Sequence, residues 1–362
     1  PGECGPVTLA LCQDVQAEGF DWPEAFFAPQ VWRIRRPHPD PLEVAAVADL
    51  MAAATAPVIV AGGGVQYADA HEALERFARR HNVPVVETQA GKSSMPWDHP
   101  LNLGPVGVTG SESANAACRR ADVVIGVGTR FQDFVTGSWS LFAHPGRRLI
   151  SINVAAYDAM KHGAMPVCAD AGVALAALGA ALGDRRFAGP EPGGKERWFA
   201  AVDPLTAAPG DANALPTDQQ VIGAVQRAAG PATVIMGAAG TMPGELHKLW
   251  KAGRPMSYHM EYGYSCMGYE IAGALGIRMA APDADVIAMA GDGSYLMLNS
   301  ELAAAAAMAV PFTVVVTDNR GFGCINRLQM ATGGAEFNNL LDHAAHTTPL
   351  HVDFAAHAAS LG

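Results

Sequence analysis

Two short motifs in the C-terminal third have the residue types and spacing of a site for Mg²⁺ and phosphate. Gly291-Asp292-Gly293-Ser294 follows an apolar run, and Asn319 lies 27 residues after Asp292, with Gly321 two positions further on. A carboxylate, an amide oxygen and a backbone carbonyl are the hard oxygen ligands that suit Mg²⁺. Glycine lets the backbone approach a diphosphate, whose charge backbone N–H groups can bind. The alternative interpretation is an ordinary Asx turn at each position.

Each motif follows a predicted buried strand, at residues 286–290 and 312–317. Because the ends of consecutive parallel strands lie along one edge of a sheet, we expect Asp292 and Asn319 to converge there. The other elements predicted in this block are a strand at 233–236 and helices at 217–229, 269–280 and 299–308. Short apolar strands between amphipathic helices predict a parallel sheet that is covered on both faces.

A second alternating block precedes this one, so the fold class is α/β, with tandem doubly wound parallel-sheet domains. Its predicted elements are strands at 58–61, 83–87, 123–127 and 149–154 and helices at 41–54, 68–81 and 112–120. Residues 20–41 contain five prolines and are predicted to be a linker. Residues 183–216, rich in Gly, Pro, Ala and Asp, form a second break. Residues 7–11 read as a short strand that belongs to a domain further upstream.

Two glycine turns in the first block stand where a dinucleotide fingerprint would stand. Gly62-Gly63-Gly64 and Gly126-Val127-Gly128 each follow a predicted strand, but the last glycine of G-x-G-x-x-G is replaced by Tyr67 and Phe131. A strand-to-helix turn favours glycine in any case. A purely structural turn and a nucleotide site both remain open.

The composition narrows the class of protein. The chain has 362 residues, with 24 Lys+Arg against 35 Asp+Glu, a formal net charge of −11 and 50% hydrophobic residues. An acidic chain without a basic cluster is not expected to bind nucleic acid or an anionic membrane. The six cysteines are scattered without metal-like spacing, and this pattern is typical of a reduced, cytoplasmic protein. The longest uncharged run, 302–317, is Ala-rich and contains a proline, so no membrane span is predicted.

The GDGS motif, followed after 23 residues by Asp318-Asn319, resembles the metal–diphosphate motif of thiamine-diphosphate-dependent enzymes. The resemblance implies thiamine diphosphate and Mg²⁺ as cofactors, with Asp292, Asn319 and the Gly321 carbonyl as metal ligands. It also implies that Met267 supports the bent cofactor from below, although a methionine is more often core filler. The cofactor-contacting residues implied are Ala239, Gly240, Thr241, Cys266, Met267, Gly291, Gly293 and Ser294.

The order of the blocks resembles the acetolactate-synthase-like architecture. It implies that residues 1–20 are the tail of a missing pyrimidine-binding domain, 41–182 a central domain, and 214–362 an incomplete diphosphate-binding domain. The glutamate that activates the cofactor would lie in the missing domain. The family resemblance also implies a homodimer or homotetramer with the active site between subunits.

Residues 258–270, YHMEYGYSCMGYE, depart from the small, Gly-rich run that most of the family carries here. They resemble the branch that hydrolyses a C–C bond of a cyclic polyhydroxylated 1,2-dione, trihydroxycyclohexane-1,2-dione, giving 5-deoxyglucuronate in inositol catabolism. His259 and Glu261, just before the predicted cofactor support, are candidates for proton transfer. Hydrogen bonding within the loop is an equally good interpretation of both.

Three other functions are compatible with the sequence. An acetolactate-synthase-like carboligase or a 2-oxoacid decarboxylase would share the cofactor. A nicotinamide-dependent oxidoreductase would need the complete fingerprint that fails at both glycine turns. A cofactor-binding module without activity of its own is the third, because the fragment would lack half of the active site.

Overall fold

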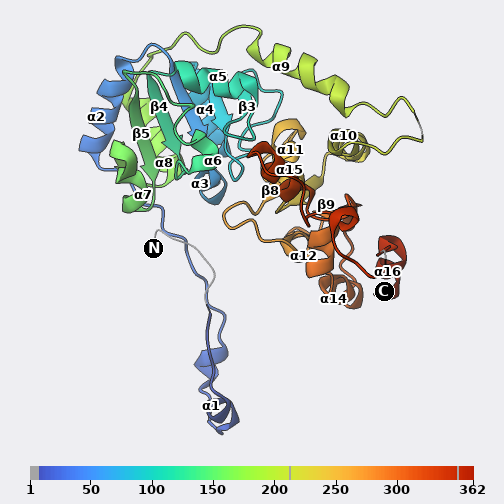
Figure 1. Ribbon diagram of the computed structural model, residues 1–362. Helices are drawn as coiled ribbons and strands as arrows, with labels where there is room; N and C mark the ends of the chain where they lie inside the picture. The colour runs from blue at the N-terminus through green and yellow to red at the C-terminus, as the bar shows by residue number, and fades with distance from the viewer. Residues whose placement is uncertain (1–7, 212, 349) are drawn as a thin grey trace.

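The computed structural model describes residues 8–211, 213–348 and 350–362. It contains two parallel sheets in two α/β domains that lie side by side, as the sequence predicts (Figure 1). Residues 8–35 project away from both domains as an extended arm with two short helices, α1 (Gln13–Ala17) and the 3-10 helix η1 (Glu24–Phe27), and Arg36 rejoins the first domain through an ion pair with Asp170 (Figure 1). No helix among the described residues is long and apolar enough to cross a membrane.

The first sheet has six strands in the order β3-β2-β1-β4-β5-β6, the order of doubly wound nucleotide-binding sheets. All its strand pairs are parallel. The strands are β1 (Pro57–Ala61), β2 (Val85–Glu87), β3 (Asn102–Pro105), β4 (Val123–Val127), β5 (Arg148–Asn153) and β6 (Met165–Cys168).

Helices cover both faces of this sheet because successive strand residues point to opposite sides. Ile59 and Ala61 pack with residues of α2, α4 and α8, whereas Val58 and Val60 pack with α5 and the segment 131–142. The helices of this domain are α2 (Pro41–Ala52), α3 (Gly63–Tyr67), α4 (His71–His81), α5 (Glu112–Arg120), α6 (Asp133–Thr136), α7 (Ala156–Met160), η2 (Lys161–Gly163) and α8 (Ala171–Ala181).

The glycines of the two fingerprint-like turns pack against each other. A side-chain carbon on Gly62 would lie 2.3 Å from the Gly128 carbonyl oxygen, and one on Gly64 would lie 2.5 Å from the Gly128 Cα atom. Close approach of the two turns therefore accounts for these glycines without a ligand.

The second sheet has four strands in the order β10-β9-β7-β8, again all parallel. One face packs against α10 and α11, and the other packs against α12. The strands are β7 (Thr233–Gly237), β8 (Tyr258–Met260), β9 (Asp285–Gly291) and β10 (Thr313–Thr317). The helices are α10 (Asp218–Ala228), α11 (Met242–Leu249), α12 (Tyr269–Ala280), α13 (Asp292–Met297), α14 (Glu301–Ala307), α15 (Gly323–Ala331), η4 (Leu341–His343) and α16 (Phe354–Ser360).

Three details of the predicted elements are wrong. The helix predicted at 68–81 begins three residues later, as α4 (His71–His81), because Asp69 has a positive φ of 50° that separates it from the short helix α3, which was not predicted. The break at 183–216 contains α9 (Gly194–Val202) and η3 (Asp203–Thr206), whose Trp198 and Phe199 pack onto the second core. Residues 8–11 form no strand, and position 7 lies outside the described residues.

Buried polar contacts join the two domains. The Tyr258 hydroxyl donates to Gln89 Oε1 over 2.8 Å, and Gln89 Nε2 donates to the Pro243 carbonyl over 3.1 Å. Thr109 Oγ1 and His247 Nδ1 are 2.9 Å apart. Gln89 and Thr109 follow β2 and β3 of the first sheet, so the strand-end loops of the first domain pack against α11 and β8 of the second. We call these four side chains, Gln89, Thr109, His247 and Tyr258, the domain seam.

Burial keeps the His247 ring of the domain seam uncharged near neutral pH. The ring is 1% exposed, and burial, with a smaller contribution from Lys92, lowers the pKa of His247 to about 3. An unperturbed histidine titrates near pH 6.5. Between those two pH values the unfolded chain takes up a proton that the folded chain does not, so folding is destabilised as the pH falls.

We therefore expect His247→Asn to flatten the pH dependence of stability. Below pH 6.5 the free energy of unfolding of the unmodified chain should fall by about 1.4 kcal/mol per pH unit more than that of the variant, because this is the energy of one pKa unit. Urea unfolding between pH 7.5 and 5 measures the difference. His38→Asn changes an exposed histidine and should leave it unaltered. Parallel curves for His247→Asn and the unmodified chain would contradict the assignment.

Candidate functional site

The structure brings the two metal-like motifs together. Asp292 begins α13 directly after β9, and its Oδ2 atom accepts the backbone N–H of Gly321 over 2.8 Å. Its other oxygen, Oδ1, is buried and has no hydrogen-bond partner among the described residues. Burial raises the pKa of Asp292, and the nearby charge of Asp318 raises it further. A buried carboxylate with one free oxygen is well placed to bind a cation.

Gly321 and Asn319 follow β10, which pairs with β9 so that Thr317 lies opposite Gly291. Gly321 has a φ of 139°, and a side-chain carbon there would lie 2.5 Å from the Asn339 carbonyl oxygen, so only glycine fits. The Asn319 side chain lies beside Gly323, 3.1 Å from the position of a carbon on that residue. Asn319 therefore shares the strand-end edge with Asp292, although no hydrogen bond joins the two side chains within the described part of the chain.

Met267 reaches the same turn from the other side. Its terminal methyl carbon lies 3.3 Å from the position that a side-chain carbon on Gly293 would take, and the Phe322 ring lies 3.0 Å from it. A side chain at position 293 would force both groups to shift by a few tenths of an ångström. The methionine is half-buried rather than part of an apolar cluster, so plain core filling does not describe it.

The loop after β7 contains Ala239, Gly240 and Thr241, the residues expected to line a diphosphate. Gly240 has a φ of 93°, and no atom of the described residues lies within 4 Å of a side-chain carbon built there or on Gly291. The backbone is therefore open to a ligand at both turns. The Arg327 guanidinium of α15 contacts the Thr241 hydroxyl and brings a positive charge to this loop.

Arg327 is a site residue that the sequence did not predict. It lies six positions after Gly321. Only the direction of α15, which folds back over the loop after β7, places the guanidinium there. Its positive charge shortly after the metal motif was the available signal, and Arg320 within the motif carries the same charge.

Glu270 links the parts of the site. Its Oε1 atom accepts the Ala239 N–H over 3.3 Å, and its Oε2 atom accepts the Gly268 N–H over 2.9 Å. The residue is fully buried, and burial raises its pKa, partly offset by backbone N–H groups and the neighbouring Ser294 hydroxyl. The unusual glutamate therefore holds the loop after β7 against the loop that carries Met267.

The two proton-transfer candidates differ in their surroundings. Both oxygens of Glu261 accept backbone N–H groups of its own loop, at 3.0 Å from Gly263, 3.0 Å from Tyr264 and 2.7 Å from Cys266. His259 Nε2 lies 3.2 Å from the Tyr269 hydroxyl; the residue is exposed, although desolvation by neighbouring atoms lowers the pKa of His259. This geometry favours the loop-bonding interpretation for Glu261, and it leaves His259 exposed beside a hydroxyl. Cys266 contributes its backbone N–H, whereas its side chain is exposed.

The donors at this edge suit Mg²⁺ better than zinc. In residues 8–211, 213–348 and 350–362, no group of three or more His, Cys, Asp or Glu side chains is placed to hold a metal. A metal here would rely on one carboxylate, an amide, a carbonyl and oxygens from a ligand or water. Mg²⁺ accepts such a mixed oxygen shell, whereas zinc sites use three or four nitrogen, sulfur or carboxylate ligands.

Comparisons with known proteins agree with this geometry. The family model for the thiamine pyrophosphate enzyme central domain matches residues 44–178. The model for the thiamine pyrophosphate enzyme C-terminal binding domain matches residues 238–362. The two matches contain the first and the second parallel sheet respectively, apart from β7, which ends just before residue 238.

Curated relatives carry one recurring name, 3D-(3,5/4)-trihydroxycyclohexane-1,2-dione hydrolase. The relative from Geobacillus thermodenitrificans is 42% identical over 93% of this chain and 56% of its own length. The relative from Clostridium perfringens is 41% identical over 92% of this chain and 56% of its own length. The relative from Bacillus thuringiensis is 41% identical over the whole chain and 61% of its own length. The chain thus spans a little over half the length of the relatives that it matches.

We expect Glu270→Gln to destabilise the chain by about 1–3 kcal/mol. The amide has one acceptor oxygen instead of two, so either the buried N–H of Gly268 or the half-buried N–H of Ala239 loses its partner. Thermal and urea unfolding measure the loss. Glu72→Gln removes an exposed glutamate from the first turn of α4 and controls for the helix position, so its effect should be much smaller. Equal effects of the two changes would show that Glu270 does not bridge the two loops.

Proposed function

Because the chain belongs to the thiamine pyrophosphate enzyme family, we propose that it supplies the central and cofactor-binding domains of a hydrolase that cleaves a C–C bond of a cyclic 1,2-dione. The proposed substrate is trihydroxycyclohexane-1,2-dione, and the product is an open-chain aldehyde acid, 5-deoxyglucuronate, in inositol catabolism. The observation that carries this proposal is the 41–42% identity to relatives that bear the name of that hydrolase. Residues 258–270, which diverge from the general family pattern, support it.

The residues at the strand-end edge fit the two cofactors. Asp292, Asn319 and the Gly321 carbonyl would hold Mg²⁺, and the unpartnered Asp292 Oδ1 is the observation that supports this set. Gly291, Gly293 and Ser294 would face the diphosphate together with the Ala239–Thr241 loop, near the charge of Arg327. When bound, thiamine diphosphate supplies a nucleophilic carbon and an electron sink for the cleavage.

The other residues of the chain orient the substrate and handle protons. Met267, above Gly293, would fix the shape of the bound cofactor. His259, exposed and beside the Tyr269 hydroxyl, is the proposed proton-transfer residue. Glu261 would act through the loop whose backbone N–H groups it binds. Cys266 would contribute its backbone.

The setting of the enzyme is part of the proposal. Residues 41–182 and 214–362 would be the two domains, and 1–20 would follow a pyrimidine-binding domain that carries the activating glutamate. The active enzyme would be a homodimer or homotetramer in the cytoplasm, with small molecules rather than nucleic acid or membrane as its partners. The scattered cysteines and the negative charge support this setting.

We expect Asp292→Ala to weaken Mg²⁺-dependent binding of thiamine diphosphate by about 100-fold or more. Removing one partner of a buried charge interaction costs about 3–5 kcal/mol. Isothermal calorimetry with Mg²⁺ and thiamine diphosphate measures the affinity. Asp283→Ala removes an exposed carboxylate at the opposite end of the same sheet and should leave binding unchanged. Full retention of affinity in Asp292→Ala would refute the metal assignment.

The substrate proposal is tested with the chain joined to the part of the Geobacillus relative that lies outside the match. We expect cleavage of trihydroxycyclohexane-1,2-dione to one aldehyde acid, with oxygen from ¹⁸O water in the new carboxylate. Pyruvate should react poorly. It is small and apolar, so it would leave the Tyr, His and Glu side chains of residues 258–270 without hydrogen-bond partners, at a cost of about 1–3 kcal/mol each. Mass spectrometry of both reactions gives the answer. Efficient acetolactate formation would instead favour a carboligase.

A further inference from the structure

The loop that carries Met267 is fixed to the central domain at its base. Tyr258, the first residue of β8, donates its hydroxyl to Gln89. Four residues later, the Tyr262 ring meets the Phe134 ring of α6 edge to face, with centroids 5.1 Å apart. Gln89 lies in the loop after β2, and Phe134 lies in the short helix α6 that follows β4 of the same sheet. The central domain therefore contacts the chain on both sides of Glu261.

Glu261 connects the anchored residues Tyr258 and Tyr262 to the rest of the loop. Its carboxylate accepts the N–H groups of Gly263, Tyr264 and Cys266, the residue before Met267. The short segment from 261 to 266 is thus folded around one side chain. Moving Glu261 would move the backbone that positions Met267.

The sheet itself gives β8 little support. β8 has three residues and lies at the edge of the second sheet, so it pairs with β7 alone. An edge strand of this length has few hydrogen bonds of its own to fix its position. Side-chain contacts from outside the sheet therefore carry much of the constraint.

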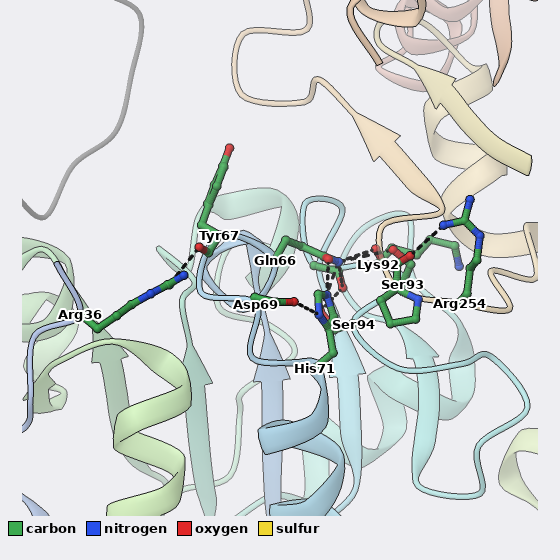
Figure 2. A network of polar contacts seen from close by, with 11 residues as sticks. Arg36, Gln66, Tyr67, Asp69, His71, Lys92, Ser93, Ser94 and Arg254 are labelled. Carbon is green, nitrogen blue, oxygen red and sulfur yellow. Dashed lines mark hydrogen bonds and ion pairs between the residues drawn. The ribbon is translucent and has the colours of Figure 1, made fainter. Parts of the chain in front are cut away.

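The opposite side of the contact is well ordered by its own hydrogen bonds. Figure 2 shows the Gln66 amide pointing at the loop that follows Gln89, where it donates to the Lys92 carbonyl over 3.0 Å. Ser94 Oγ donates to the Gly91 carbonyl within the same loop. The Lys92 ammonium group, 4% exposed, lies 5.6 Å from the centroid of the Tyr258 ring. Gln89 is therefore presented to Tyr258 from a buried and internally bonded loop.

We propose that Gln89 and Tyr258 are positioning residues through which the central domain holds the 261–268 loop, and with it Met267, in place. Neither residue needs to touch the cofactor or the substrate. The relevance of this loop to catalysis rests on the proposed function, whereas the mechanical link between the domain seam and the loop does not.

The first test is Tyr258→Phe, which removes only the hydroxyl. Hydrogen–deuterium exchange of the 362-residue chain should show the amides of Gly263, Tyr264 and Cys266 exchanging about threefold to tenfold faster, the effect of losing one hydrogen bond. Thr233→Val is the matched control, because it removes the buried hydroxyl that donates to Asp285 at the far end of the sheet. It should leave exchange in the loop unaltered.

Gln89→Leu is a second test, because it removes the acceptor of the hydrogen bond that the Tyr258 hydroxyl donates. If the two side chains act through each other, the double variant should loosen the loop no more than either single variant does. Unchanged exchange in both single variants, or loosening that spreads evenly over the whole second domain, would overturn the proposal.

Activity separates this proposal from the proposed function. In the chain joined to the Geobacillus segment, Tyr258→Phe should lower kcat for dione cleavage while the affinity for thiamine diphosphate stays the same. An equal loss of affinity and kcat would contradict a positioning role. If Tyr258→Phe loosens the loop but the unmodified joined protein does not cleave the dione, the proposed function is rejected and the positioning link is supported. If the unmodified protein cleaves the dione but Tyr258→Phe leaves the loop unaltered, the positioning link is rejected and the proposed function is supported.

Discussion

The candidate site depends on one buried carboxylate, that of Glu270. Parallel strands bring the loops after β7, β9 and β10 to one edge of the second sheet, but that geometry alone leaves each loop free to move. Glu270 accepts backbone N–H groups from the loop after β7 and from the Met267 loop, and Ser294 of the β9 turn lies beside it. A fully buried carboxylate is costly unless its oxygens are bonded, so the loops and the charge stabilise one another. The metal-like pair, Asp292 and Gly321, is positioned against this fixed group of loops.

Much of the fold could be predicted from hydrophobic periodicity and from the glycine and proline residues that separate helices and strands. The helices at 112–120 and 269–280 and the strand at 123–127 match the observed bounds. The short strands β3, β6 and β8 escaped prediction because three or four residues carry too little alternation to stand out. α9 escaped because its sequence lies within a Gly- and Pro-rich break, and tertiary contacts hold it, among them the packing of Trp198 and Phe199 and the hydrogen bond from Lys195 to the His99 carbonyl. The α3–α4 division depends on a single left-handed residue, Asp69, that no pattern announces.

Site residues that lie close to a strand end could be predicted from the sequence. Site residues that reach the site only through the path of a distant element could not. Asp292 and Asn319 could be placed at one sheet edge in advance because each closely follows a strand, whereas the hydrogen bond from the Gly321 N–H to Asp292 became visible only in the structure. Arg327 could not, since its approach to Thr241 depends on the path of α15. The role of Glu261 is a third case. Its residue type suggested acid–base chemistry, but three backbone N–H groups occupy its oxygens, and only coordinates reveal that competition.

The polar character of the domain seam explains how a domain can shape a site without entering it. An apolar seam would hold two domains together over a range of orientations, because the hydrophobic effect has no direction. Here Gln89, Thr109, His247 and Tyr258 each need a particular partner. A small rotation would leave buried donors and acceptors unpaired at about 1–3 kcal/mol each. The free energy of the seam therefore rises steeply when the domains are displaced from each other. Because Tyr258 of β8 belongs to the seam, the position of β8 is restricted in the same way. The cost of burying polar groups is what makes the orientation of the two sheets specific.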